Sequence, residues 1–191
     1  MKGTYLFLAD GFEISEALTT VNMLRRGGVN VKTVSIYDDR IVTSSNRIPV
    51  VADMAFGEFR ASTSFGPCLK TDVMIFPGGM PGSSNLAAFG KLMDIMQQHY
   101  AEGGTLAAIC AAPSVVLGLL PNLEGRKMTC YDGFEEALIA KGAEYVKDGV
   151  VVDGQIITGR GPGWAVDFGL AILAKLKGQD VADKVKAGLM L

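Results

Sequence analysis

The sequence predicts an α/β fold built on a doubly wound parallel sheet. Short apolar runs rich in β-branched residues alternate along the chain with segments of helical period, a pattern typical of parallel strands joined by crossover helices. The chain has 191 residues, of which 49% are hydrophobic and 20% charged. A single domain spanning residues 1 to 191 can therefore bury a sizeable core.

Five apolar runs are expected to form the parallel strands. They lie at residues 4 to 9, 31 to 37, 72 to 77, 105 to 110 and 155 to 159. Between the first two runs, apolar residues from Ile14 to Leu24 recur at helical spacing, and Gly27 and Gly28 end the helix. This segment completes a first βαβ unit.

The remaining segments continue the alternation. Residues 41 to 71 suggest a strand or hairpin beside the main sheet, and residues 145 to 158 predict a hairpin with Asp-Gly turns. Helices are expected at residues 86 to 100, 113 to 120, 134 to 142, 161 to 178 and 180 to 191.

Composition and charge exclude several classes of function. The formal net charge is −2, with Lys and Arg scattered along the chain, so we expect neither a nucleic acid nor a membrane as a partner. The N-terminal apolar run is too short for a secretory signal, and the three cysteines are irregularly spaced. This pattern favours reduced thiols in a cytoplasmic protein over a disulfide framework or a zinc site, and we expect no metal and no cofactor.

Three unusual loops follow the carboxyl ends of predicted parallel strands. Their sequences are ADGFEISE, PGGMPGSSN and CAAPS. Ligands of doubly wound sheets bind in the crevice at this edge. The loops therefore predict one shared site.

Cys110 is the candidate nucleophile of this site. It falls at a sharp strand-to-helix turn, with Pro113 in the first helical turn, where its missing N–H costs nothing. A helix N-terminus lowers the pKa of a thiol from ~8.5 and raises the thiolate fraction. Cysteine is also often buried as a small hydrophobe, so this loop alone leaves both interpretations open.

Glycines and carboxylates surround this position in the predicted fold. Gly78 and Gly79 can present backbone N–H groups to an oxyanion, or can merely make a turn. Glu13 and Glu16 can share one helical face, although carboxylates also favour first turns for the helix dipole. A carboxylate beside a thiolate must share a proton with it, and such a pair can transfer a proton to a reacting carbonyl.

The only histidine, His99, is expected on the surface, at the far end of a helix that leads to the amino end of a strand. A Cys-His hydrolase needs an imidazole beside its thiol, and the residue after the candidate nucleophile is Ala111. Peptide or amide hydrolysis therefore ranks low. Cys68 and Cys130 are interpreted as structural, although Cys130 follows a predicted strand and can border the site.

Four segments together resemble the ThiJ/PfpI superfamily, in the branch that contains the Parkinsonism-associated deglycase. They are FLADGFEISEALTT, IFPGGMPGSSNL, AAICAAPSVVL and ITGRGPGWAVDFGLAI, and they span nearly the whole chain in the order of the family. The resemblance implies a flavodoxin-like sandwich of helices around the sheet, usually as a homodimer.

The resemblance also implies roles for individual residues. The nucleophile falls on Cys110, and the carboxyl group hydrogen-bonded to it falls on Glu16, with Glu13 less directly involved. The N–H groups of Gly79 and Ala111 would form a pocket for an oxyanion or a sulfinate.

Several positions depart from the family pattern. Ala111 replaces the histidine of the protease-like branch, and Tyr131 stands where relatives of the deglycase often carry histidine. The usual polar pocket residue falls on Asn46, or one position later on Arg47.

Two functions from different classes remain open. The first is a cofactor-independent enzyme, similar to glyoxalase III or a deglycase, that acts on methylglyoxal-type 2-oxoaldehydes or glycated adducts. The second is an oxidative-stress sensor or chaperone in which Cys110 is oxidised to the sulfinic acid. Both use the same thiol, so the sequence does not separate them.

Overall fold

A seven-stranded sheet forms the centre of the computed structural model, which describes residues 1 to 190. The strand order is β10-β11-β7-β6-β1-β2-β5, and every neighbouring pair is parallel except the β10–β11 pair. The strands are β1 (Thr4–Leu8), β2 (Val31–Ser35), β5 (Met54–Ala55), β6 (Val73–Phe76), β7 (Thr105–Ile109), β10 (Val150–Asp153) and β11 (Ile156–Gly159). The predicted α/β fold with a doubly wound, mostly parallel sheet is confirmed.

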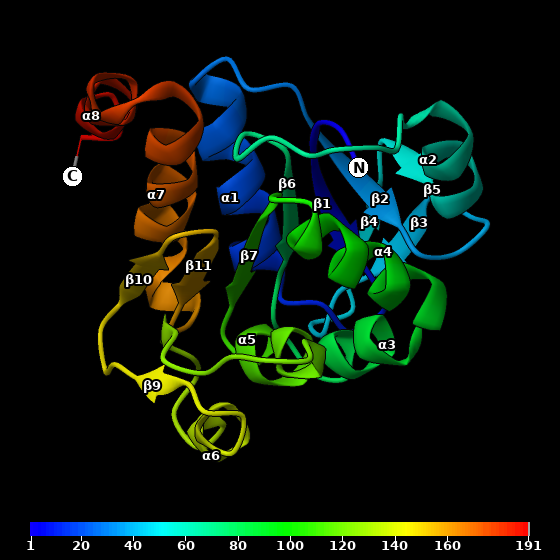
Figure 1. Ribbon diagram of the computed structural model, residues 1–191. Helices are drawn as coiled ribbons and strands as arrows, with labels where there is room; N and C mark the ends of the chain where they lie inside the picture. The colour runs from blue at the N-terminus through cyan, green and yellow to red at the C-terminus, as the bar shows by residue number, and fades with distance from the viewer. Residues whose placement is uncertain (191) are drawn as a thin grey trace.

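Helices cover both faces of this sheet (Figure 1). One face carries α1 (Ile14–Arg26), α7 (Ala165–Lys177) and α8 (Gln179–Ala187), and the other carries α2 (Phe56–Ser62), α3 (Gly82–Ala88), α4 (Gly90–Ala101) and α5 (Ala112–Val115). Smaller elements lie beside these layers. They are the hairpin of β3 (Ile41–Thr43) with β4 (Pro49–Val51), the pair of β8 (Lys127–Met128) with β9 (Glu144–Tyr145), and α6 (Glu135–Ile139).

Two apolar cores follow from the alternation of side chains along the strands. In β1, Leu6 and Leu8 enter the core under α1 and α7, whereas Phe7 enters the core under α2, α3 and α4. Both faces are buried, which is why the strand has a continuous apolar sequence. Helices α1 and α7 approach closely because Gly169 has no β-carbon: one placed there would lie 2.9 Å from the Cβ of Met23.

Several predicted boundaries were wrong. The helix expected at residues 86 to 100 is two helices separated at Phe89, whose ring packs against Phe56 with a centroid distance of 4.7 Å. Only the second half of residues 145 to 158 forms the predicted hairpin, because Tyr145 pairs with β8 instead. Helix α2 was not predicted, and the final predicted helix ends at Ala187.

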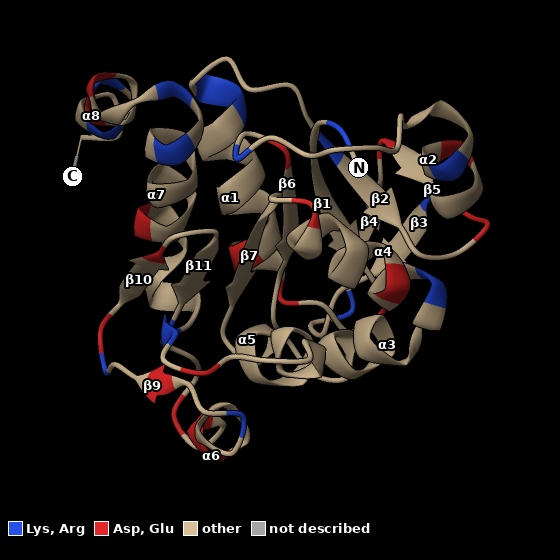
Figure 2. Ribbon diagram, in the orientation of Figure 1, with Lys and Arg blue, Asp and Glu red and all other residues tan. Residues whose placement is uncertain are grey.

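Charged side chains lie around the outside of this fold. Lys and Arg segments are interspersed with Asp and Glu segments on both helical layers (Figure 2). Within residues 1 to 190, every helix is too short or too polar to cross a membrane.

Candidate functional site

The structure brings the three predicted loops together at the carboxyl ends of β1, β6 and β7. Gly78 lies between the other two loops: a β-carbon there would stand 2.5 Å from the Cβ of Cys110 and 2.7 Å from Oε2 of Glu16. Only glycine fits this position without displacing the thiol or the carboxyl group. The backbone after β6 therefore passes between the thiol and the acid.

Cys110 occupies a strained backbone position directly after β7. Its φ is +66°, in the left-handed region that costs an L-residue roughly 1–2 kcal/mol. Two hydrogen bonds hold the residue there: its N–H donates to the carbonyl of Gly159 at 2.9 Å, and its carbonyl accepts from the N–H of Tyr131 at 2.8 Å. The side chain is only 9% exposed. Strain maintained in this way is characteristic of functional positions.

Glu16 is a fully buried carboxyl group in the first turn of α1. Its Oε2 accepts a hydrogen bond from the N–H of Gly78 at 2.8 Å. Its own N–H donates to Oε2 of Glu13 at 2.6 Å, so Glu13 caps the helix and fixes the start of the turn. Oε1 of Glu16 is buried without a hydrogen-bond partner among the described residues. Burial is the largest influence on this group and raises its pKa to about 7.

The use of the Gly78 N–H corrects one expectation. The sequence predicted both glycines as donors to an oxyanion, but the N–H of Gly78 is taken by Glu16. The backbone N–H groups of Gly79 and Ala111 are the ones that act on the thiol and favour its ionised form. Gly79 has a φ of +89°, and the loop of Gly11 and Glu13 leaves no space for a β-carbon there.

The pKa of Cys110 is raised to about 12, first by burial and then by the charge of Glu16. The expectation of a lowered thiol pKa was wrong, because burial and the Glu16 carboxylate raise it by more than the N–H groups of Gly79 and Ala111 lower it. The two groups therefore titrate as a pair. Above about pH 7 the pair keeps one proton and one negative charge. In that state the proton is mainly on the Cys110 thiol and the charge on Glu16. A neutral Glu16 beside a thiolate is the less populated form, and transfer of the shared proton produces it.

The polar turn predicted to contribute Asn46 or Arg47 lies next to the site. The N–H of Ser45 donates to the carbonyl of Phe12 at 2.9 Å, which joins the turn between β3 and β4 to the loop before α1. Both candidate side chains are exposed. Within residues 1 to 190, neither forms a side-chain hydrogen bond or an ion pair with the thiol or the acid.

Cys130 and Tyr131 follow the short strand β8. Cys130 is fully buried in the core under α3 to α5, as expected for a structural cysteine. Tyr131 is exposed and lines a pocket together with Arg160 and Trp164. The loop after β11 that carries the last two residues was not predicted as part of a site. It follows a parallel strand, as the three predicted loops do, so the same rule would have identified it.

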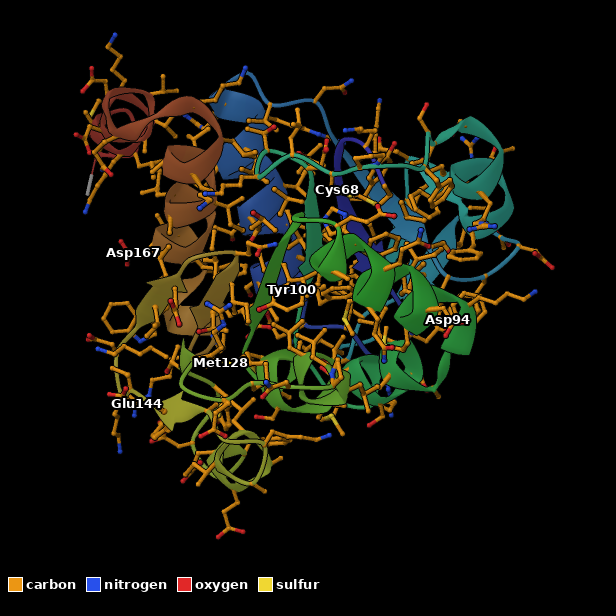
Figure 3. All side chains as sticks on the ribbon, in the orientation of Figure 1. Cys68, Asp94, Tyr100, Met128, Glu144 and Asp167 are labelled. Atoms are coloured by element: carbon orange, nitrogen blue, oxygen red, sulfur yellow. The ribbon has the colours of Figure 1, made fainter. Side chains whose placement is uncertain are left out.

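The prediction that His99 lies on the surface was wrong. The side chain is fully buried, and its Nε2 lies 3.1 Å from the carbonyl oxygens of Asp72 and Thr105 at the amino ends of β6 and β7. Burial lowers the pKa of the imidazole to about 4. The five residues of β7 place it roughly 16 Å from Cys110. In Figure 3 its neighbour Cys68 lies in the upper part of the view, above and to the right of Met128.

The described part of the chain contains no group of three or more His, Cys, Asp or Glu side chains placed to hold a metal ion. The geometry brings together the thiol, the acid and two backbone N–H groups. Such a set can add a thiolate to a carbonyl carbon, hold the resulting oxyanion and transfer a proton beside it.

Known proteins share this fold and much of this sequence. The DJ-1/PfpI family matches residues 2 to 175. Protein DJ-1 homolog A of Arabidopsis thaliana is 35% identical over 190 residues, which cover 100% of this chain and 47% of that protein. The chain thus spans about half the length of the two Arabidopsis relatives that it matches.

Other matches cover nearly all of both proteins. A glutathione-independent glyoxalase of Caenorhabditis elegans is 28% identical over 176 residues, which cover 92% of this chain and 89% of the relative. The structure of an oxidized DJ-1 of Toxoplasma gondii has a TM-score of 0.88 and 30% identity, and the match covers 100% of this chain and 98% of that one.

Proposed function

The chain belongs to the DJ-1/PfpI family, and we propose that it is a cofactor-independent, cysteine-dependent enzyme of the glyoxalase or deglycase kind. Its substrates would be methylglyoxal-type 2-oxoaldehydes or their adducts. The observation that carries the proposal is the buried Cys110–Glu16 pair, which holds a single proton above about pH 7. The name of the Caenorhabditis elegans relative supports the same reaction.

The first step is addition of the Cys110 thiolate to the aldehyde carbon. A C–S bond forms, and the carbonyl oxygen becomes an oxyanion within reach of the N–H groups of Gly79 and Ala111. Preorganised donors of this kind stabilise developing negative charge at no cost of reorganisation. Glu16 supplies its proton to this oxygen, which gives a neutral hemithioacetal and leaves Glu16 as a carboxylate.

The second step moves a proton between adjacent carbons. The Glu16 carboxylate removes the hydrogen from the former aldehyde carbon as a proton, which gives an enediol, and returns it to the neighbouring carbon. The hydroxyl proton on the first carbon passes to the oxygen of the second, so the hemithioacetal becomes the thioester of a 2-hydroxy acid. Water then cleaves the thioester, releasing a 2-hydroxy acid and restoring the thiol. One carbon is oxidised and its neighbour is reduced, so no external oxidant or reductant takes part.

The test is lactate formation from methylglyoxal by the purified protein. The wild type should form lactate, and Cys110→Ser should form none above the uncatalysed background. Equal lactate formation by the wild type and Cys110→Ser would exclude the proposed chemistry.

A peptidase or amidase is disfavoured on the same geometry. The imidazole of His99 lies at the other end of the sheet, where two backbone carbonyls hold its Nε2. A thiol that acts on peptides needs a base that can protonate the leaving amine.

A redox sensor is the second candidate, favoured by the unpartnered Oε1 of Glu16. If Cys110 is oxidised to a sulfinate, a protonated Glu16 can donate to it and slow the step to the sulfonate. The Toxoplasma gondii relative is described in its oxidized form. Mass spectrometry after mild peroxide treatment should find two added oxygens on Cys110. An unmodified thiol, or direct conversion to the sulfonate, would count against a sensor.

We also propose that the protein is a homodimer, as is usual in the family. The exposed apolar residues Leu18 on α1 and Ile48 and Val51 on the β3–β4 hairpin are candidates for the buried interface. Light scattering should give twice the mass of the chain, and a monomer at micromolar concentration would contradict the proposal.

A further inference from the structure

A pocket lies between the loops that follow β8 and β11, both of which are hydrogen-bonded to the backbone of Cys110. It has a volume of about 290 Å³ and is lined by Tyr131, Asp132, Arg160, Pro162 and Trp164. None of these residues takes part in the proton transfer proposed above. The pocket is therefore a candidate for binding the part of the substrate that lies beyond its two carbonyl carbons.

Both walls of the pocket are joined to the peptide groups of Cys110. The N–H of Tyr131 donates to the carbonyl of Cys110 at 2.8 Å, and the N–H of Cys110 donates to the carbonyl of Gly159, the residue before Arg160, at 2.9 Å. One wall therefore starts on each side of the nucleophile. The pocket thus flanks the turn that carries the thiol.

The walls present two aromatic rings to solvent. Tyr131 is 48% exposed and Trp164 is 43% exposed. Glycine backbone supports each ring: the indole of Trp164 packs directly on Gly149, and a β-carbon on Gly161 would lie 3.3 Å from the Tyr131 ring. Large aromatic side chains held in this way offer flat apolar surface with little loss of conformational freedom.

Arg160 is fixed beside these rings by Asp132. Its Nε donates to Oδ1 at 2.9 Å and its Nη2 to Oδ2 at 2.7 Å, the bidentate geometry that orients a guanidinium most strictly. The carboxylate offsets the positive charge, while the remaining N–H groups of the fork can donate to a substrate oxygen. The pocket thus combines an aromatic surface with oriented donors and little net charge.

We propose that this pocket is an aryl subsite, which binds the ring of aromatic 2-oxoaldehydes and makes them better substrates than methylglyoxal. The proposal rests on the proposed function. Phenylglyoxal would follow the same course: the thiolate adds to its aldehyde carbon, the hydrogen of that carbon moves to the ketone carbon, and water releases mandelate. Atoms and electrons balance without a further reactant.

The kinetic test compares phenylglyoxal with methylglyoxal as the ratio of their kcat/KM values. Stacking on one ring should favour the aromatic substrate about tenfold, so the ratio should fall by about that factor in Trp164→Ala and in Tyr131→Ala. Trp164→Phe keeps an aromatic ring and should retain most of the wild-type ratio. Phe65→Ala removes an aromatic ring that is 41% exposed on the loop after α2, and should leave the ratio unchanged. An unchanged ratio in both pocket variants would overturn the aryl subsite.

A binding test separates this inference from the proposed function. Trp164 is the only tryptophan of the chain, so its fluorescence reports on this pocket alone. Mandelate should quench the fluorescence at about tenfold lower concentration than lactate, and Tyr131→Ala should weaken that preference. If the protein turns over neither aldehyde but prefers mandelate, the proposed function fails and the subsite stands. If mandelate and lactate bind alike, the subsite fails whatever the activity.

Discussion

Two cysteines with ionisable neighbours lie at opposite ends of one sheet. Cys110, at the carboxyl end of β7, lies beside the Glu16 carboxyl group and the N–H groups of Gly79 and Ala111. Cys68, at the amino end, lies 3.1 Å from Nδ1 of His99. The sequence elements of a Cys-His pair are thus present, but they are separate from the crevice in which α/β folds bind ligands.

The comparison shows that an imidazole near a thiol does not by itself make a nucleophile. Burial keeps His99 neutral, with a pKa lowered to about 4, and raises the pKa of Cys68 as well. The N-terminal ammonium of Met1 donates to Sγ of Cys68 at 3.0 Å and lowers this pKa, but burial raises it by more. The Glu102 carboxylate, whose Oε2 lies 3.4 Å from Sγ, opposes a thiolate as well. At the other end, burial and Glu16 also raise the pKa of Cys110, but the N–H groups of Gly79 and Ala111 act against that rise, and the adjacent Glu16 carboxylate can take the thiol proton.

Replacing each cysteine by serine should give the largest difference in activity between the two ends of the sheet. We expect Cys110→Ser to lower kcat/KM for methylglyoxal by about 10³-fold or more, because a serine hydroxyl is not ionised at neutral pH. Cys68→Ser should retain wild-type turnover, as measured by lactate formation. A comparable loss of kcat/KM in both variants would show that catalysis does not specifically require the thiol at the carboxyl end.

Removing the acid should have the next largest effect. Glu16→Gln should lower kcat/KM by about 10²- to 10⁴-fold, because the amide cannot transfer a proton. In the wild type, kcat/KM should rise with pH through about 7 as the pair loses its first proton, and this rise should vanish in the variant. Glu13→Gln is the matched control, since its amide oxygen can still accept from the helix N–H. A larger loss in Glu13→Gln would reverse the two roles.

The same substitution should stabilise the fold at high pH. The pKa of Glu16 is raised from 4.5 to about 7, so its contribution to stability is fully present below pH 4.5 and is lost as pH rises through 7. Glu16→Gln lacks this loss and should gain up to about 3 kcal/mol relative to wild type between pH 4.5 and 8. Urea unfolding of both proteins at pH 4.5 and 8 measures the difference in their free energies of unfolding. If that difference were the same at both pH values, Glu16 would not be a buried carboxyl group that titrates in this range.

At the amino end of the sheet, the contribution of His99 to stability should depend on pH with the opposite sign. The pKa of His99 is lowered from 6.5 to about 4, so its contribution is present above pH 6.5 and is lost as pH falls through 4. Among its charged neighbours are the N-terminal amine of Met1, Asp72 and Glu102. This loss amounts to at most about 3 kcal/mol between pH 7 and 4.

His99→Gln tests that sign. The variant should be less stable than wild type at pH 7, because it disturbs buried hydrogen bonds, but the gap in the free energy of unfolding should narrow toward pH 4. Urea unfolding at pH 7, 5.5 and 4 measures the gap. A constant gap would mean that the imidazole does not titrate in this range.

Much of the architecture could be predicted because its signals are local. The five strands of the parallel core, the helix from Ile14 to Arg26 and the loop that carries Cys110 all lie where the apolar pattern places them. The break at Phe89 and the short helix α2 could not be predicted, because both depend on ring contacts between distant segments: Phe59 of α2 packs on Phe7, and Phe56 on Phe89. Local pattern does not encode such packing.

The sequence by itself determined the parallel sheet and the candidate Cys110, since the positions of strands and loops follow from hydrophobic periodicity, and the family resemblance singled out Glu16. Only the tertiary structure decided how these residues behave. The hydrogen bond from the Gly78 N–H to Glu16 joins residues 62 positions apart. Because of this bond, the Gly78 N–H is not free to bind an oxyanion, as the sequence had predicted. Burial raised the pKa of both members of the pair and hid a histidine expected on the surface. Desolvation depends on every segment that packs around a group, so it exists only once the chain has folded.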